Sequence, residues 1–281
     1  ERGVVNLEEL KSMAGDIRVD IVKMVAEAGS GHPGGSLSAA DIMCALYFGG
    51  VLKHDAENPK AEDRDRFLLS KGHAAPALYA TLAEAGYFPK EELATLRKLH
   101  SRLQGHPDCR KLPGVEASTG SLGQGLSIAA GMALGLKLNG SESSVFTLMG
   151  DGECQEGQVW EAAMFAAHKG LDNLVAIVDH NHLQIDGRIE TVCSPEDLGD
   201  KFRSFGWQVF QCDGNDMEAI LATLESAKES RSGKPCVIVA ETTKGKGVSF
   251  MEDQAGWHGK APNAEQTEQA LAELTANKEA K

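Results

Sequence analysis

The sequence predicts an α/β fold in which a parallel sheet is covered by helices on both faces, giving three layers. Three observations indicate this fold. Short, nearly continuous apolar segments recur along the second half of the chain, amphipathic helical segments alternate with them, and glycine-containing polar loops follow them. A chain of 281 residues can bury one large core. We therefore expect residues 1–281 to form a single domain, with a helical tail over about 264–281.

The first half is predicted to be mostly helical. Apolar residues recur every three or four positions from Leu7 to about Ala28, and Asn6 with Glu9 resembles a capping box at the start of this segment. Composition predicts loops at 30–35 and 114–125, both rich in glycine. The other helices expected here run to about Tyr47 after a cap at Ser38 or Asp41, over 74–86, over 90–103, and from the second loop to about 138.

The second half alternates between strands and helices. The apolar segments expected to form strands are 145–149, 174–178, 207–211 and 236–240, and the helices between them are expected at 157–168, 196–205 and 216–230. The residues predicted to form the core are Ile21, Val25, Val145, Phe146, Leu148, Val175, Ile177, Val237 and Val239.

Composition excludes several classes of function. The net charge is −13 and no long basic tract is present, which argues against nucleic acid as a partner. No apolar run reaches the roughly 18 residues that a membrane span needs. The six cysteines are scattered without a C-x-x-C pair, as expected for reduced thiols. We expect a cytoplasmic protein, although a chain that begins at Glu1 leaves a processed start open.

Polar residues follow two consecutive strands at the edge where a parallel sheet binds its ligands. Gly150-Asp151-Gly152 directly follows the strand at 145–149, and Asn181 follows the strand at 174–178. Mg²⁺ favours such carboxylate and amide oxygens together with phosphate. Taken alone, Gly150-Asp151-Gly152 is more typical of an ordinary strand-to-helix turn. Because Asn181 follows the next strand at this spacing, the tripeptide and Asn181 together favour a metal site.

Gly150-Asp151-Gly152 followed by Asn181 resembles the thiamine diphosphate motif. The usual motif has Asn or Asp directly before its Asn, whereas this chain has His180. Further segments resemble transketolase in order and spacing from about residue 7 to 262. They are Ser30-Gly31-His32-Pro33-Gly34-Gly35, the stretch 63–73 ending in Lys71-Gly72-His73, the stretch 105–125, and Trp257-His258-Gly259-Lys260-Ala261-Pro262.

The resemblance implies a thiamine diphosphate-binding fold and a role for each matched residue. The metal, magnesium with calcium or manganese as alternatives, would be bound by Asp151, Asn181 and the carbonyl of Leu183. Contacts to thiamine diphosphate are implied for His73, Gly120, Ser121, Leu122, Gly152, Glu156, Asn181, Ile185 and His258. Catalytic or substrate contacts are implied for His32, His106, His258 and Glu156.

Some positions keep a second interpretation. Ser121 replaces a proline that is frequent in the family's loop, although backbone contacts tolerate the change. Glu156 and Glu161 near a helix start suit the helix dipole, whereas the resemblance implies that they connect paired active sites at a subunit interface. The unmatched histidines, His54, His100, His168 and His182, are expected to be ordinary surface or hydrogen-bonding residues.

The resemblance implies the N-terminal subunit of a thiamine diphosphate-dependent transketolase of the pentose phosphate type. Such an enzyme transfers a two-carbon ketol unit from a ketose phosphate to an aldose phosphate. In the family, the activating glutamate and the pyrimidine pocket belong to a second domain, so we expect a C-terminal partner subunit, with two copies of each chain. A shortened form of a full-length enzyme is the alternative. A deoxyxylulose-phosphate synthase, the alpha subunit of a 2-oxo-acid dehydrogenase and a non-catalytic cofactor-binding module also stay open.

Overall fold

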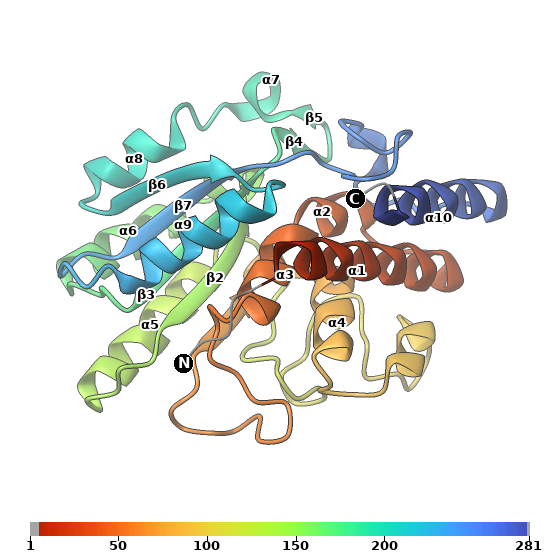
Figure 1. Ribbon diagram of the computed structural model, residues 1–281. Helices are drawn as coiled ribbons and strands as arrows, with labels where there is room; N and C mark the ends of the chain where they lie inside the picture. Colours follow the sequence, from red (N-terminus) through yellow and green to blue (C-terminus); the bar gives the residue numbers. More distant parts are fainter. Residues whose placement is uncertain (1–5, 280–281) are drawn as a thin grey trace.

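The computed structural model describes residues 6–279, which form a three-layer α/β domain around a five-stranded parallel sheet (Figure 1). The strand order is β1-β2-β3-β7-β6, and all four pairings are parallel. These strands are β1 (Arg66–Leu69), β2 (Val145–Gly150), β3 (Leu174–His180), β6 (Gln208–Asp213) and β7 (Cys236–Glu241). Two short strands, β4 (Leu183–Gln184) and β5 (Gly187–Arg188), form a separate antiparallel pair. The predicted fold class is confirmed.

Helices connect the strands and cover the sheet. The α-helices are α1 (Leu7–Ala28), α2 (Pro33–Ser38), α3 (Ala40–Phe48), α4 (Ala75–Glu84), α5 (Gly125–Leu138), α6 (Gly157–His168), α7 (Ile189–Cys193), α8 (Leu198–Ser204), α9 (Met217–Glu229) and α10 (Ala264–Glu279). Four short 3₁₀ turns are η1 (Gly72–Ala74), η2 (Lys90–Thr95), η3 (Gly152–Gln155) and η4 (Ala255–Trp257). Within residues 6–279, every helix is too short or too polar to span a lipid bilayer.

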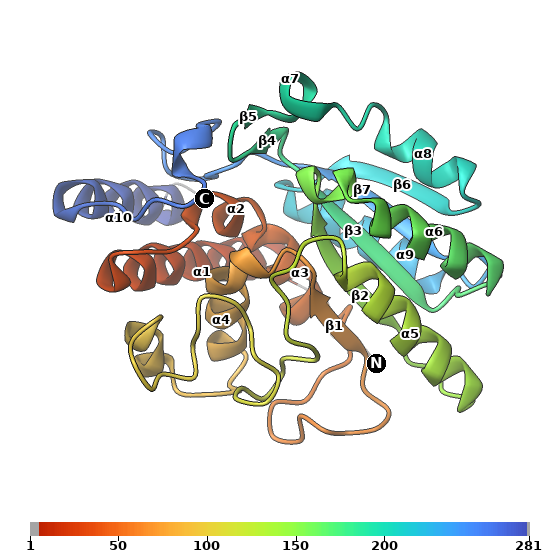
Figure 2. The ribbon, with the colours of Figure 1, turned by 180° about the vertical axis from the view of Figure 1, so that it is seen from behind.

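The alternation of side chains along the central strands divides the core into two layers. On β2, Phe146 and Leu148 pack with α1, α3, α4 and α9, whereas Val145 and Met149 pack with α5, α6 and α8. Figure 1 shows α9 and α3 in front of the sheet, and Figure 2 shows α5 and α6 covering the opposite face. All nine residues predicted for the core are buried.

The first and last helices of the described chain pack against each other. α1 begins at the predicted cap, where the Asn6 side chain accepts from the backbone N–H groups of Glu8 and Glu9. α1 and α10 run side by side in both views (Figures 1 and 2). Leu274 of α10 is buried in the same layer of the core as Leu10 and Ile17 of α1. The C-terminal helix is therefore part of the domain's packing.

Two local predictions are wrong, and one strand was missed. The helix expected over 90–103 is only η2, because Arg97 and His100 have φ angles of 61° and 66°, which end a right-handed helix. The helix expected to run to about Tyr47 is α3, but its predicted cap is wrong: Ala39 is the N-cap, Asp41 lies in the first turn, and Ser38 ends α2, which begins within the predicted loop at 30–35. Strand β1 was not predicted, because its four residues are too short for a pattern.

Candidate active site

The predicted meeting of two strand ends is observed. Gly150 at the end of β2 pairs with Asp179 near the end of β3. Asp151 follows and is buried, and its Oδ2 accepts a hydrogen bond of 2.6 Å from the His182 backbone N–H. Its Oδ1 accepts from the N–H of Gly152 at 2.7 Å. One β-α-β unit thus places the Asp151 carboxylate directly against the segment that carries Asn181.

The other two predicted metal ligands lie in this same segment. Asn181 is buried, and its Oδ1 accepts from the Leu183 N–H at 3.2 Å. The carbonyl oxygen of Leu183 accepts from the Lys244 ammonium group at 3.1 Å. The structure therefore brings together three oxygen donors of the kind that hard divalent cations bind.

A buried ion pair lies beside this segment. The Lys71 ammonium group contacts the Asp179 carboxylate, and both side chains are almost completely buried. Ser38 from α2 donates to the same carboxylate at 2.6 Å. Burial acts to raise the pKa of Asp179, but Lys71 and the donated hydrogen bonds outweigh it and hold that pKa below its usual range. Asp179 is therefore ionised and balances the charge of Lys71.

Lys244 is a second buried cation at this edge. Its Nζ lies 3.1 Å from the Leu183 carbonyl and 2.9 Å from Nδ1 of His258. Burial and the nearby Lys71 ammonium group lower the pKa of Lys244 to about 8. Its two hydrogen-bond partners are uncharged, so Lys244 has no hydrogen-bonded counter-ion and could donate to a bound anion.

Three of the predicted histidines form one group. The ring of His32 lies 5.4 Å from those of His73 and His258, measured between centroids. The rings of His73 and His258 are stacked at 5.0 Å. They come from the start of α2, from η1 and from the residue after η4, three segments that are widely separated along the chain. Only the fold brings them together.

Burial keeps these imidazoles neutral. Burial first, followed by nearby cations, lowers the pKa of His32 to about 4 and that of His258 to about 3, and lowers that of His73 well below its usual value. In His258, Nδ1 accepts from Lys244, so the proton of the neutral ring lies on Nε2. At neutral pH the three rings can donate and accept hydrogen bonds without carrying charge.

His106 lies against the predicted cofactor loop. Gly120 has a φ angle of 140°, and a Cβ atom on it would lie 2.7 Å from Cδ2 of His106. A Cβ atom on Gly72 would lie 2.6 Å from the backbone nitrogen of Gly120. Both glycines therefore allow a close approach that a side chain would block. Burial and then the Arg97 charge lower the pKa of His106.

Glu153, which was not predicted for the site, joins the loop at 120–125 to the turn after β2. It is buried, and its Oε1 accepts from Ser70 and from the Gly123 N–H, the latter at 2.9 Å. Its Oε2 accepts from the Gly150 N–H at 3.1 Å. This carboxylate therefore links the segments that carry Ser70, Gly123 and Gly150.

The remaining predicted residues lie at the rim. Glu156 is exposed at the start of α6 and packs close to Gly123, while Glu161 is exposed one turn further along this helix. Ser121 is exposed and Leu122 is half-buried, both beside Gly120. Ile185, between β4 and β5, is 69% exposed. Gly152 lies under the side chains of Gln184 and Ile189. In the described part of the chain, none of these residues stacks on, or forms an ion pair with, His32, His73 or His258.

Lys71, Lys244, Asp179 and Glu153 were missed by sequence reasoning. Lys71 lies two positions before His73 and Asp179 two positions before Asn181, yet a charged residue near a motif is usually solvated. The available signal was that Asp179 directly follows the apolar segment 174–178, where a buried carboxylate would need a partner. Nothing in the sequence identifies that partner as Lys71.

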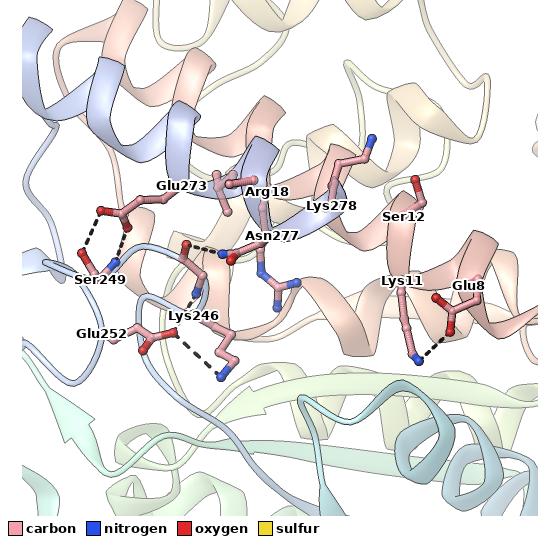
Figure 3. Close-up of a pocket in the computed structure, with 14 residues that line it drawn as sticks. Glu8, Lys11, Ser12, Arg18, Lys246, Ser249, Glu252, Glu273, Asn277 and Lys278 are labelled. Atoms are coloured by element: carbon pink, nitrogen blue, oxygen red, sulfur yellow. Dashed lines mark hydrogen bonds and ion pairs between the residues drawn. The ribbon is translucent and has the colours of Figure 1, made fainter. Parts of the chain in front are cut away.

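A large cavity lies elsewhere on the domain. It measures about 880 Å³ and lies between α1, α10 and the loop after β7 (Figure 3). Hydrogen bonds already satisfy charged groups on its walls, including Glu8 with Lys11 at 2.8 Å and Glu273 with Ser249 at 2.8 Å. None of the predicted site residues lines it. We therefore place the candidate active site at the strand ends.

The residues at the strand ends fit a diphosphate and a divalent cation. Burial, followed by repulsion from Asp179, raises the pKa of Asp151, as expected for a carboxylate that lacks a cation. Lys244 lacks an anionic partner among its hydrogen bonds. Nδ1 of His32 is buried without a hydrogen-bond partner among residues 6–279. A cation beside Asp151, an anion beside Lys244 and a polar group beside His32 would satisfy all three.

Comparison with known proteins identifies the family. The family described as "Transketolase, thiamine diphosphate binding domain" matches residues 10–281. The 6-deoxy-6-sulfo-D-fructose transketolase subunit of Clostridium sp. (strain MSTE9) is 45% identical over 95% of this chain and 96% of its own length. An apulose-4-phosphate transketolase subunit of Phocaeicola vulgatus is 43% identical over 96% of this chain and 95% of its own length.

Solved structures agree. The crystal structure of transketolase from Campylobacter jejuni superposes with a TM-score of 0.90 at 36% identity and covers 96% of this chain. The chain spans only 43% of that transketolase, so it matches one part of the longer enzyme and nearly the full length of the two subunits above. The chain belongs to the transketolase family, in which it corresponds to the thiamine diphosphate-binding domain.

Proposed function

We propose that this chain is the diphosphate-binding subunit of a two-polypeptide transketolase. The observation that carries the proposal is the convergence, at one edge of the sheet, of oxygen donors around Asp151, two buried lysines and three neutral histidines. Residues 1–281 would act as one domain whose tail, α10, packs on α1. The six free cysteines suit a cytoplasmic protein.

The metal end of the site would hold Mg²⁺, with Ca²⁺ or Mn²⁺ as alternatives. Asp151, Asn181 and the Leu183 carbonyl would be its protein ligands. Lys71 and Lys244 would face the diphosphate, because an ammonium group stabilises a phosphate oxygen most strongly where water is excluded. Lys244 would move from the Leu183 carbonyl to the anion when the metal takes that carbonyl. Gly152, Gly120, Ser121, Leu122 and Ile185 would make the remaining contacts to the cofactor.

The histidines would handle the sugar. Thiamine diphosphate, when bound, supplies the nucleophilic carbon and the electron sink that ketol transfer requires. The neutral rings of His32 and His106 can accept a proton from a sugar hydroxyl or donate a hydrogen bond to it. His258, whose Nδ1 already accepts from Lys244, can donate from Nε2. His73, stacked on His258, would contact the cofactor and fix the orientation of that ring. The site's own residues thus bind and orient the sugar while they move its hydroxyl protons.

A partner subunit would complete the site. Both of the relatives described above are themselves named subunits. The α6 helix exposes Met164 and Phe165, which are 61% and 39% accessible, on the same helix as Glu156 and Glu161. An apolar surface next to acidic residues supports docking of a second polypeptide there. We propose two copies of each chain, with Glu156 and Glu161 at the interface.

The substrates would be sugars with an anionic terminus. One relative is named for a sulfosugar and the other for a sugar phosphate. We propose that the chain, together with its partner, transfers a two-carbon ketol unit from a ketose phosphate to an aldose phosphate. The family match favours this reaction over those of deoxyxylulose-phosphate synthase and the 2-oxo-acid dehydrogenases.

The test is a ketol-transfer assay with thiamine diphosphate and Mg²⁺. This chain and the C-terminal half of a two-polypeptide transketolase are assayed alone and mixed, with ketose phosphate and 6-deoxy-6-sulfofructose as alternative donors. We expect turnover only in the mixture, because a cofactor held by its diphosphate alone lacks the orientation that the reaction needs. Robust turnover by this chain alone would overturn the two-polypeptide assignment. A mixture that binds cofactor but transfers nothing would indicate a non-catalytic module.

Alanine at His32, His106 or His258 should lower kcat/KM in the complete enzyme by roughly a hundredfold each, the usual scale of a lost proton-transfer group or a lost hydrogen-bond donor to the reacting molecule. The melting temperature should change little, since none of the three side chains belongs to the hydrophobic core. The matched control is His100→Ala, whose ring is exposed on a loop. If all three variants keep full activity, the substrate roles are wrong.

A further inference from the structure

Two histidines left out of the proposed site form a cluster with two carboxylates where β3 and β7 end. His180 and Glu241 are register partners at the last residues of β3 and β7. Nδ1 of His180 lies 2.7 Å from Oε1 of Glu241, and Nε2 of His182 lies 2.8 Å from Oε2 of the same carboxylate. One carboxylate thus bridges two imidazoles.

The cluster is next to the proposed magnesium ligands, but the His180 side chain points to the other side of β3 from Asp179. Along β3, Val175 and Ile177 pack toward the helices α1, α3, α4 and α9, and Asp179 continues that row toward Lys71. Ala176 and Val178 pack toward α5, α6 and α8, and His180 continues this second row. Because side chains alternate along a strand, His180 and the proposed magnesium ligand Asn181 lie on different sides of the chain.

His182 is held in place by its backbone as well as by its ring. Its φ angle is 62°, which is uncommon for a residue other than glycine. Its N–H donates to Asp151 and its carbonyl accepts from the Ile189 N–H at 3.0 Å. Its second ring nitrogen, Nδ1, lies 2.8 Å from Glu190. A histidine with one nitrogen toward a shared site and the other fixed by a carboxylate has the arrangement of a metal ligand with an outer-shell partner.

We propose that His180, His182 and Glu241 form a second metal site, selective for Zn²⁺ or a similar transition metal. One potential ligand atom from each residue lies within 4.8 Å of the others. Tetrahedral zinc with bonds of 2.0–2.2 Å needs ligand atoms about 3.4 Å apart. The side chain of Glu241 is 54% exposed, so small rotations can close the site and solvent gives the metal access.

The chemistry of the ligands separates this site from the one at Asp151. Two imidazoles and one carboxylate suit Zn²⁺, Co²⁺ or Ni²⁺, whereas the oxygen-only donors at Asp151 suit Mg²⁺. With Glu190 behind His182, the two carboxylates balance the charge of a divalent ion. The metal would clamp the end of β3 to the end of β7, and it would thereby hold the turn that presents Asn181 and the Leu183 carbonyl.

The proposal is tested with the metal-free full chain. Co²⁺ and Zn²⁺ are titrated in excess Mg²⁺, with absorption spectra for Co²⁺ and calorimetry for Zn²⁺. We expect the chain to bind one equivalent of metal ion with saturation, and the Co²⁺ form to show the visible absorption bands of four-coordinate Co²⁺. Binding should be lost in His180→Asn and in Glu241→Gln. It should weaken about ten- to hundredfold in Glu190→Gln, because that carboxylate acts only through His182.

Two control variants separate the alternatives. His100→Gln removes an exposed histidine outside the cluster, and Asp151→Asn alters the oxygen site but keeps an acceptor for the His182 N–H. Both variants should still bind one equivalent of Co²⁺ or Zn²⁺. Circular dichroism checks that each variant is folded. The proposal is overturned if no saturable equivalent binds, if binding survives in Glu241→Gln and His180→Asn, or if it is lost in Asp151→Asn. A thiolate charge-transfer band would also overturn it, because it would place the metal on an exposed cysteine such as Cys109 or Cys193.

Discussion

Replacing Asp151 with alanine is expected to lower the affinity for thiamine diphosphate at least tenfold. The change removes the only charged oxygen among the three proposed magnesium ligands. Losing a charge-assisted contact costs about 1.5–3 kcal/mol or more, and 1.4 kcal/mol corresponds to about a tenfold change in affinity. The measurement is calorimetric titration of the cofactor in Mg²⁺, with the partner subunit present.

Two further variants make this result specific. Asp151→Asn keeps an acceptor for the His182 N–H but lacks the charge, so it should lose nearly as much affinity as the alanine variant. Asp213→Ala is the matched control, since Asp213 also ends a strand at this edge of the sheet but is exposed. Unchanged affinity in both Asp151 variants would refute the metal assignment.

Replacing Lys71 with methionine should destabilise the domain by about 3–5 kcal/mol, because it leaves the Asp179 carboxylate buried without its counter-ion. Ser38 and Thr242 still donate to that carboxylate, but hydroxyl groups carry no charge to balance it. Urea unfolding followed by circular dichroism measures the loss.

The double variant Lys71→Met with Asp179→Asn should recover much of this loss, since the buried charge is then gone and the amide oxygen still accepts from Ser38. Lys137→Met is the control. Lys137 is 44% exposed and pairs with Asp172, so its loss should cost about 1 kcal/mol or less. A Lys71→Met variant as stable as the control would show that Asp179 is not ionised in the folded protein.

The sequence was sufficient to predict which segments meet wherever spatial neighbours are also consecutive elements of the chain. The β2–α6–β3 unit is one strand, one helix and the next parallel strand, so the meeting of Asp151 with the segment of Asn181 could be predicted from the order of these elements alone. The same logic failed at 90–103. Apolar spacing suggested a helix there, but Arg97 donates its N–H to the Leu103 carbonyl at 2.8 Å and closes a turn. The spacing of apolar residues carries no information about such a hydrogen bond.

The sequence by itself determined the fold class, the central strands and the residues that follow them, because periodicity and glycine placement are local properties of the chain. Only the tertiary structure decided which charges and rings meet. Lys71 and Asp179 are separated by 108 positions, and His180 lies 61 positions from Glu241. No local signal relates such residues. They pair because a parallel sheet brings strand ends from distant segments to one edge, and because burial there stabilises a charge only beside its partner.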